Sequence, residues 1–585
     1  MPRKAQGSED IENAKASSLA KQQKAMRSPL TLLLHSPRLH LTNYPMNIMK
    51  VPSVASLAFA ALLLSNQPGW AQTEVQKLIA SDATALAEFG RSIDADAVTI
   101  VIGATPDIST GTGAAYVYES PAGTWVEVAK LMPSDGAAGD SFGDHIRLDG
   151  DRMIVGAPRH NSQGVDAGAA YVFERIGSTW TEVQKLTASD GAAGDFFGST
   201  VELQGDLILV GSHLDDDQGS DSGSVYVFDR VGGVWGETVK LTASDGAAAD
   251  HFGKELALDG QLALIGAPRD STSAGSFAGS CYVFERTMGS WSQTTKLTAS
   301  DAAGHDVFGT SIDLEGEVAV IGAYRNDDQG SSSGSAYVFR RIAPGLWNQD
   351  QKLLPSDGVA GDWFSSSVAI KGSRLLVGAH KDEGPIIDIG SSYVFEYKCG
   401  SWEQTSKITA SDGQAGDVFG GPAILLEEGA VLAARGVDNF TGAAYTFGFD
   451  TPSSPTLAGC PESISIATGG THAFALNAGT SHAFKTYLLL GSASGTSPGI
   501  EINGEHLPLQ VFDSYFLFTV NNLNQGPFQN TLGILSSTGT ATASLTVPIG
   551  YPSLAGLTLH HAYVVFNPNQ AVALASNATP LQLVP

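Results

Sequence analysis

Residues 197–241 read FGSTVELQGDLILVGSHLDDDQGSDSGSVYVFDRVGGVWGETVKL, and they show the secondary structure of one repeated unit. Ser199–Leu203 alternates polar and apolar residues, which is typical of a half-buried strand. The turn Gln204-Gly205-Asp206 leads into Leu207–Val210, a continuous apolar run that is expected where both faces of a strand are covered. A polar loop follows, and Ser224–Arg230 and Trp235–Leu241 then read as two further strands. The stretch therefore predicts four antiparallel strands.

The same unit occurs seven times. Its Phe-Gly pair, replaced once by Phe-Ser, begins at positions 89, 142, 197, 252, 308, 364 and 419. A Gly-Ala pair or a relative lies fourteen residues after each Phe, an aromatic strand follows, and a Trp strand closes six of the copies. Seven copies of a four-stranded unit predict an all-β fold, a seven-bladed β-propeller over 72–450.

The ends of the repeat region predict how the ring closes. The seventh copy reaches Tyr445-Thr446-Phe447 but has no Trp strand after it, whereas an unmatched strand at 70–78 resembles 180–186. We expect this amino-terminal strand to complete the last blade, because closure would remove two exposed sheet edges. A signal cleavage before Gln72 would remove Trp70 from this strand and leave Gln72–Leu78.

The units resemble FG-GAP repeats, the blades of the integrin α-subunit propeller. Phe197-Gly198 with Gly211, and Phe142-Gly143 with Gly156-Ala157-Pro158, carry the resemblance over roughly 72–450. In integrins an Asp-x-Asp-x-Asp-Gly loop between the first two strands binds calcium. Here only short hairpins occupy that connection: Asp149-Gly150-Asp151, Gln204-Gly205-Asp206, Asp259-Gly260-Gln261, Glu315-Gly316-Glu317 and Lys371-Gly372-Ser373. The family's metal site is therefore not carried over, and we expect no cofactor.

Two rows of aspartates recur in phase with the Phe residues. The first row, seven residues before each Phe, is Asp82, Asp135, Asp190, Asp245, Asp301, Asp357 and Asp412. The second row, two residues before the Phe, is Asp140, Asp195, Asp250, Asp306, Asp362 and Asp417. We interpret both rows as caps of loop amides. A calcium site is the alternative for the loop acids Asp215, Asp216 and Asp217, and for Asp327 and Asp328 beside Asn326.

Strand alternation places these aspartates on one rim of the propeller. The loops between blades and the loops between the second and third strands share one face, and the hairpin turns lie on the other. Arg175, Arg230, Arg286, Arg340 and Arg341 border that other face. We therefore predict one strongly acidic face, which would attract cations or a basic partner.

The termini differ from the repeat region. Residues 1–45 are polar and basic, an upstream artefact or a disordered segment, and 46–71 have the pattern of a secretory signal peptide. We expect a secreted or cell-surface protein with no transmembrane segment in the mature chain. Residues 451–455 read as a linker, and 456–585 as a β-sandwich module with strands at 463–466, 472–476, 486–490, 515–520, 540–547 and 562–566.

Chemistry-bearing residues are scattered. Histidines 145, 160, 213, 251, 305 and 380 lack the paired spacing of a zinc site. Three cysteines, Cys281, Cys399 and Cys460, leave a Cys399–Cys460 bridge or free thiols open, and we expect free thiols. We identify no catalytic, cofactor-binding or metal-binding residue.

The chain has 33 basic and 60 acidic residues among 585, a net charge of −27, which disfavours nucleic acid as a partner. Rigid repeat frameworks present binding loops, so we predict an exported, non-enzymatic binding or adhesion protein for a protein or glycan partner. The alternatives are a polysaccharide-acting enzyme that uses the acidic face or the central funnel, and a structural envelope protein.

Overall fold

The computed structural model describes most of the chain after residue 71. The described residues are 72–105, 111–120, 123–383, 388–449, 456–460, 463–465, 467–478, 480–494, 496, 500–502, 505–509, 515, 519, 523–525, 527–536, 540–547, 554–555, 557–567 and 572–584. The expected upstream segment 1–45, the signal peptide 46–71 and the linker 451–455 lie outside these residues. Among the described residues, no helix is long and apolar enough to cross a bilayer.

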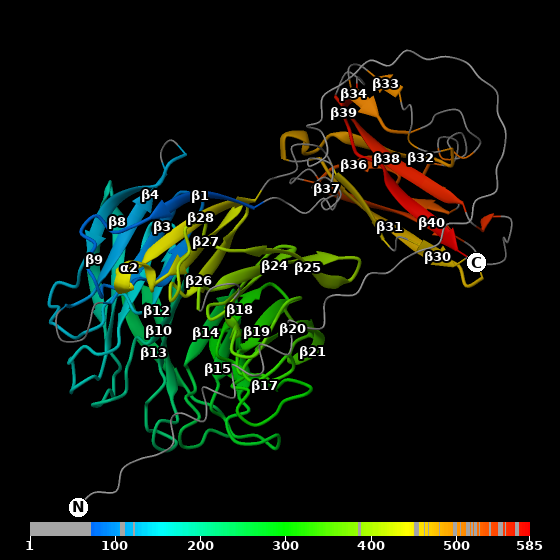
Figure 1. The fold of residues 1–585 in the computed structure, drawn as a ribbon. Helices are drawn as coiled ribbons and strands as arrows, with labels where there is room; N and C mark the ends of the chain where they lie inside the picture. Colours follow the sequence, from blue (N-terminus) through cyan, green and yellow to red (C-terminus); the bar gives the residue numbers. More distant parts are fainter. Residues whose placement is uncertain are drawn as a thin grey trace, which may run out of the picture. The chain divides into compact units, whose positions relative to one another are not determined.

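Seven four-stranded antiparallel sheets follow one another between Gln72 and Phe449 (Figure 1). Blade 1 consists of β2 (Phe89–Ala95), β3 (Thr99–Ala104), β4 (Ala114–Glu119) and β5 (Val126–Leu131), and blade 2 of β6 (Ile146–Asp149), β7 (Arg152–Ala157), β8 (Ala169–Ile176) and β9 (Thr179–Leu186). Blade 3 consists of β10 (Thr200–Gln204), β11 (Leu207–Ser212), β12 (Ser224–Val231) and β13 (Val234–Leu241), and blade 4 of β14 (Glu255–Asp259), β15 (Leu262–Ala267), β16 (Ser280–Thr287) and β17 (Ser290–Leu297). Blade 5 consists of β18 (Ile312–Glu315), β19 (Val318–Ala323), β20 (Ser335–Ala343) and β21 (Leu346–Leu353), and blade 6 of β22 (Phe364–Lys371), β23 (Arg374–Ala379), β24 (Ser391–Lys398) and β25 (Ser401–Ile408).

Blade 7 joins the two ends of the repeat region. It contains β26 (Phe419–Leu426), β27 (Gly429–Ala434) and β28 (Ala443–Phe449), with the short helix α2 (Val437–Phe440) between the last two. Its fourth strand is β1 (Gln72–Leu78), which pairs antiparallel with β28 from Gln72 opposite Phe449 to Leu78 opposite Ala444. The predicted closure by the amino-terminal strand is confirmed.

The first strands of the blades form a closed cycle. β2, β6, β10, β14, β18, β22 and β26 contact one another in that order, and β26 contacts β2 in turn. The predicted seven-bladed propeller is therefore confirmed.

The repeat residues build the contacts between blades. Phe197 is fully buried, and its ring meets those of Tyr226 and Phe228 edge-on at 5.4 and 6.1 Å. Gly198 has φ +90°, and a Cβ on Gly156 would lie 2.0 Å from the Gly198 carbonyl oxygen of the next blade. Both glycines are needed because the two backbones approach closely there.

The carboxy-terminal residues form further sheets. β29 (Thr456–Cys460), β31 (Gly470–Asn477), β37 (Thr540–Val547) and β35 (Phe528–Gln529) make one, and β30 (Ser463–Ser465), β40 (Thr579–Val584), β38 (Thr558–Phe566), β32 (Thr486–Ser492) and β36 (Leu532–Ile534) make another, with β39 (Val572–Ala575) beside β38. β33 (Ile500–Ile502) pairs with β34 (Glu505–Leu507), and η1 (Thr480–His482) is a single 3-10 turn.

One strand expected in this region is wrong. Tyr515 and Thr519, the described residues of the predicted strand 515–520, have helical conformation. A short apolar run fits a buried strand and a buried helical turn equally well, so periodicity could not separate the two.

The cysteines differ from one another. Cys281 is a free thiol, fully buried in β16. Cys399 is disulfide-bonded, so the expectation of free thiols is wrong there. Cys399 lies in the exposed turn between β24 and β25, where another thiol can reach its sulfur. The side chain of Cys460 lies outside the described part of the chain.

Candidate functional site

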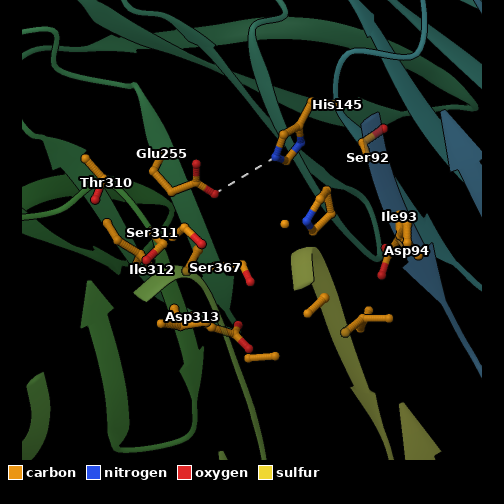
Figure 2. Close-up of a pocket in the computed structure, with 18 of the residues that line it drawn as sticks. Ser92, Ile93, Asp94, His145, Glu255, Thr310, Ser311, Ile312, Asp313 and Ser367 are labelled. Atoms are coloured by element: carbon orange, nitrogen blue, oxygen red, sulfur yellow. Dashed lines mark ion pairs between the residues drawn. The ribbon is translucent and has the colours of Figure 1, made fainter. Parts of the chain in front are cut away.

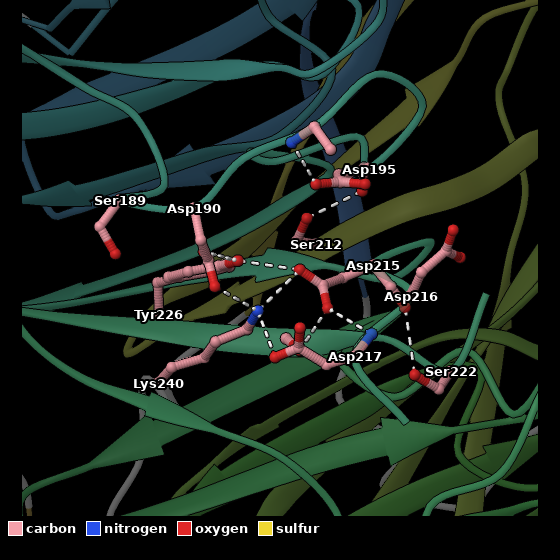
Figure 3. A network of polar contacts seen from close by, with 12 residues as sticks. Ser189, Asp190, Asp195, Ser212, Asp215, Asp216, Asp217, Ser222, Tyr226 and Lys240 are labelled. Atoms are coloured by element: carbon pink, nitrogen blue, oxygen red, sulfur yellow. Dashed lines mark hydrogen bonds and ion pairs between the residues drawn. The ribbon is translucent and has the colours of Figure 1, made fainter. Parts of the chain in front are cut away.

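The first aspartate row forms a contact that recurs in every blade, which we call the rim clasp. In blade 3 the Tyr226 hydroxyl donates to Asp190 Oδ1 at 2.7 Å, and Lys240 Nζ donates to Asp190 Oδ2 at 3.0 Å (Figure 3). The lysines of the other clasps are Lys77, Lys130, Lys185, Lys296, Lys352 and Lys407, each bonded to the aspartate of its own blade. The hydrogen bond from Lys130 holds the pKa of Asp82 below its ordinary value. The prediction that this row caps loop amides holds only for each aspartate's own amide, as at Asp82 and Asp190, because a phenol and an ammonium are the other partners of its oxygens.

The second aspartate row caps loop amides, as predicted. Asp195 Oδ2 accepts from the Ala192 amide at 2.6 Å, and Asp250 Oδ2 accepts from the Ala247 amide at 2.7 Å. The same contact over three residues recurs at Asp140, Asp306, Asp362 and Asp417. These carboxylates shape the loops that join the blades.

The candidate calcium ligands already surround a cation of the chain itself. Lys240 Nζ lies 2.9 Å from Asp215 Oδ2 and 2.5 Å from Asp217 Oδ2 (Figure 3). Lys352 pairs with Asp328 in the same way. Asp216 and Asp327 instead accept from the amides of Asp221 and Ser332. The part of the chain that the structure describes holds no group of three or more His, Cys, Asp or Glu residues arranged for a metal ion.

The predicted acidic face needs correction. The loop between blades and the loop within the blade do share a rim, because Asp190 and Asp215 bind the same lysine. The rim clasps, however, neutralise one aspartate per blade with a lysine that belongs to the fourth strand. On the other rim four of the predicted arginines pair with acids of the preceding blade: Arg175 with Glu119, Arg230 with Glu174, Arg286 with Asp229 and Arg341 with Glu285. The fifth, Arg340, pairs with Asp350 of its own blade.

The first strands enclose a central channel, with a cavity of about 470 Å³ (Figure 2). All seven blades contribute to its wall. Thr310, Ser311, Ser366 and Ser367 line it with hydroxyl groups. His145 faces Glu255 with 4.0 Å between Nε2 and Oε1.

Buried charges form a cluster in this channel. Arg147 Nε donates to Glu202 Oε1 at 2.8 Å, while Asp94 and Asp313 accept from backbone amides of the next blade. Burial raises the pKa of Glu202 to about 8, that of Glu255 to about 7 and that of Asp313 to about 6. The channel therefore contains carboxyl groups that hold protons close to neutral pH.

Replacing Glu202 tests this cluster. Folded Glu202 keeps its proton up to about pH 8, whereas the unfolded chain releases it near 4.5, so the free energy of unfolding falls as pH rises through this window. We expect Glu202→Gln to flatten that fall and to be more stable than wild type at pH 9 by about 1–3 kcal/mol. Urea unfolding at pH 5 and pH 9 measures both values. Glu317→Gln, in an exposed turn, is the control, and a Glu202→Gln slope equal to wild type would contradict the assignment.

Aromatic and histidine side chains of blades 3 to 6 lie beside the channel, where His213 contacts the lining residue Ser199 and Trp363 contacts the lining residue His380. We call this end of the channel the mouth. Phe196, His251 and Trp363 each stand directly before the repeat Phe. The residue at this position has a left-handed φ in all seven copies, from 47° at Glu88 to 58° at Ser141, so this conformation belongs to the repeat.

The mouth side chains of neighbouring blades meet in two groups. In blades 3 and 4, the His213 ring lies 6.1 Å from that of Phe196 and 5.5 Å from that of His251. In blades 5 and 6, the Trp363 ring lies 4.9 Å from that of Tyr324 and 5.4 Å from that of His380, which lines the cavity. Burial lowers the pKa of His251 and of His380 to about 4, so both imidazoles are neutral at pH 7.

Sequence reasoning missed the mouth. The histidines have no zinc spacing, and the mouth residues are not among the positions that the repeats share. The available signal was the opposite one: the residue before the repeat Phe is Glu88, Ser141, Phe196, His251, Val307, Trp363 and Val418 in the seven copies. Positions that differ among otherwise similar repeats are where a function specific to this protein is expected.

Comparison with known proteins defines the class. The FG-GAP repeat family matches residues 72–118, 125–173, 180–228, 235–284, 291–339, 347–395 and 402–447. This chain therefore belongs to the FG-GAP repeat family, and its propeller consists of seven such repeats.

Solved structures resemble the fold at low identity. The uncomplexed acylaminoacyl peptidase of Pyrococcus horikoshii matches 67% of this chain and 58% of its own, with 10% identity and a TM-score of 0.37. Its orthorhombic crystal form matches 66% and 57%, with 10% identity and a TM-score of 0.35. The β-propeller domain of the Trilobed protease from Pyrococcus furiosus, described as having an open velcro topology, matches 58% and 90%, with 8% identity and a TM-score of 0.33. No curated protein sequence matches the chain.

Proposed function

We propose that this protein is an exported, non-enzymatic binding protein whose glycan ligand enters the mouth of the central channel. The observation that carries the proposal is that aromatic and imidazole side chains form two clusters at the mouth, one around His213 and one around Trp363. Tyr324 and Trp363 are partly exposed, although aromatic rings elsewhere in the blades fill the core. Partly exposed rings on a rigid frame provide apolar faces for sugar rings.

The rest of the propeller is built as a support for this site. Gln184 Nε2 donates to the Trp235 carbonyl at 2.7 Å, and its Oε1 accepts from the Trp235 amide at 2.9 Å, which ties blade 2 to blade 3. Gln76 and Gln351 make the same paired contact with Trp125 and Trp402. Together with the rim clasps, these contacts fix neighbouring blades and make the propeller a rigid support for the mouth.

Two further expectations belong to this proposal. The signal pattern at 46–71 supports export, and residues 456–585 are proposed to form a β-sandwich module. The two larger carboxy-terminal sheets contribute to one apolar core, for example through Phe474 of β31 and Tyr563 of β38. This shared core supports two sheets that face each other.

An enzyme that acts on polysaccharide is the second candidate. It is favoured by Glu202 and Glu255, which burial gives raised pKa values of about 8 and about 7 inside the channel. Glycoside hydrolysis uses one protonated and one ionised carboxyl group, and a carboxyl group with a raised pKa can serve as the protonated one.

Affinity electrophoresis separates the two candidates. The full chain is run in gels that contain neutral or acidic polysaccharides, and the same mixtures are assayed for new reducing ends. We expect slowed migration without new reducing ends, and its loss in Trp363→Ala but not in Tyr397→Ala, an exposed ring near the opposite rim. Thermal melts confirm that both variants are folded.

Two results would contradict the proposal. New reducing ends that disappear in Glu202→Gln would establish the enzyme instead. Unchanged migration with every polysaccharide would exclude glycan binding at the mouth.

A further inference from the structure

The basic side chains of the propeller are almost all neutralised by ion pairs. Between residues 72 and 450 the chain has 24 Lys and Arg against 53 Asp and Glu. Within 4.0 Å, 19 of the 24 have an acidic partner among the described residues. The five that have none in this part of the chain are Lys254, Arg269, Arg325, Lys381 and Arg435. Acidic residues outnumber basic ones about twofold in this segment, so five basic side chains without an acid within 4.0 Å are unexpected.

These five cations lie together around the mouth, and we call them the cationic crescent. Arg269, Arg325 and Lys381 occupy one position of the repeat, seventeen residues after Phe252, Phe308 and Phe364. Lys254 and Arg435 line the cavity itself. The crescent therefore spans the successive blades 4, 5, 6 and 7.

Aromatic rings hold the crescent cations in place. Lys381 Nζ lies 3.7 Å from the centre of the Trp363 indole, and the Arg325 guanidinium lies 5.5 Å from the centre of the Tyr324 ring. Arg269 contacts the His251 imidazole at 3.4 Å. These contacts fix the direction of each charge without neutralising it.

Arg269 and Arg91 repel Lys254, whereas Asp144 and Glu255 attract it, and Glu88 and Asp144 attract Arg435. The positive charges of Arg269 and Lys254 act on His251. Burial is the largest cause that lowers the pKa of His251, and these two cations lower it further. An anionic ligand relieves this repulsion when it binds.

The rest of the channel lining contains hydroxyl and carboxyl groups. Thr310, Ser311, Ser366 and Ser367 line the channel together with Glu255 and Glu202. The four hydroxyl groups donate to backbone carbonyls, so their oxygens are placed to accept. Hydroxyl and carboxylate oxygens accept hydrogen bonds from the hydroxyl groups of a ligand. The complementary ligand thus carries an anionic group beside several hydroxyl groups.

We propose that the mouth binds acidic polysaccharide, with the carboxylate or sulfate groups on the cationic crescent and sugar hydroxyl groups directed into the channel. This inference rests on the proposed function and names its ligand class. Acidic peptides and single-stranded nucleic acids carry charge without that density of hydroxyl groups, and they are competitors in the test.

The test measures binding of the full chain to five polymers by biolayer interferometry: polygalacturonate, dextran sulfate, neutral dextran, polyglutamate and oligothymidylate. We expect the two acidic polysaccharides to bind, and their affinity to fall about tenfold or more between 50 and 300 mM salt. Arg325→Gln with Lys381→Gln is expected to weaken their binding at least about tenfold. Lys398→Gln, whose ammonium pairs with Glu396 in β24, is the matched control and should bind like wild type.

Each remaining outcome has a defined meaning. Equal binding of neutral dextran, or unchanged binding by the double variant, overturns the acidic ligand and leaves the proposed function in place. Tighter binding of polyglutamate or oligothymidylate overturns it in favour of that polymer. Failure of all five polymers to bind contradicts the proposed function as well. If the double variant does not fold, Arg269→Gln alone is expected to give a smaller loss of the same kind.

Discussion

Deleting Gln72–Leu78 from the full chain is expected to lower the free energy of unfolding by about 5 kcal/mol or more and to promote aggregation. The deletion removes the fourth strand of blade 7 and with it the burial of Leu78, which is 2% exposed. Truncating one buried leucine costs about 2–5 kcal/mol by itself, and the lost backbone hydrogen bonds add to this. β28 would become an open edge.

The deletion also removes side-chain contacts to both neighbours. Gln76 bonds to the backbone of Trp125 in blade 1, and Glu74 accepts from the amide and hydroxyl of Ser411 in the loop that leads into blade 7. Urea unfolding followed by tryptophan fluorescence measures the effect. Val75→Ser, in the same strand but 58% exposed, is the control and should change stability by less than about 0.5 kcal/mol. A deletion variant as stable as wild type would show that the strand does not close the ring.

Replacing Lys240 with Met is expected to destabilise the protein by about 2–4 kcal/mol. The ammonium is the only cation described within 4.0 Å of Asp190, Asp215 and Asp217, and Asp215 is 3% exposed. Without it, the three carboxylates repel one another and one of them is left charged in a buried position. Thermal melts and urea unfolding measure the loss.

Calcium distinguishes this explanation from a loss of packing. The three carboxylates that surround Lys240 Nζ are oxygen ligands of the kind that calcium prefers. Millimolar calcium is therefore expected to raise the melting temperature of Lys240→Met and to leave wild type unchanged. Lys130→Met is the matched control: its ammonium pairs with Asp82 alone, half exposed, so the cost should stay below about 1 kcal/mol with no calcium response. A Lys240→Met protein that calcium does not stabilise would contradict a purely electrostatic role for the lysine.

The architecture could be predicted because its determinants repeat in phase. The Phe-Gly pair and the Tyr-Val-Phe strand recur in nearly every blade, since each must fill the same space between neighbours. Closure of the ring by the amino-terminal strand could be predicted for the same reason, because residues 73–78 repeat the sequence of 181–186 in the fourth strand of blade 2.

The site could not be predicted in this way. Asp190, Tyr226 and Lys240 belong to different loops and strands of blade 3, so their contact depends on the three-dimensional blade. The sequence showed the acids as a row and gave no sign that a lysine neutralises each one. The mouth depends on residues that differ between copies, such as Trp363 and Lys381, and the search for shared positions passes over these.

Formation of a disulfide across β1 and β28 tests the closed ring most directly. Thr73 lies opposite Gly448 in the pairing of the two strands, so Thr73→Cys with Gly448→Cys places two thiols on adjacent backbones. Oxidation followed by mass spectrometry of proteolytic fragments is expected to show this bond within a single chain, together with a higher melting temperature. Absence of the bond, or its formation only between separate chains, would contradict a ring closed by the amino-terminal strand.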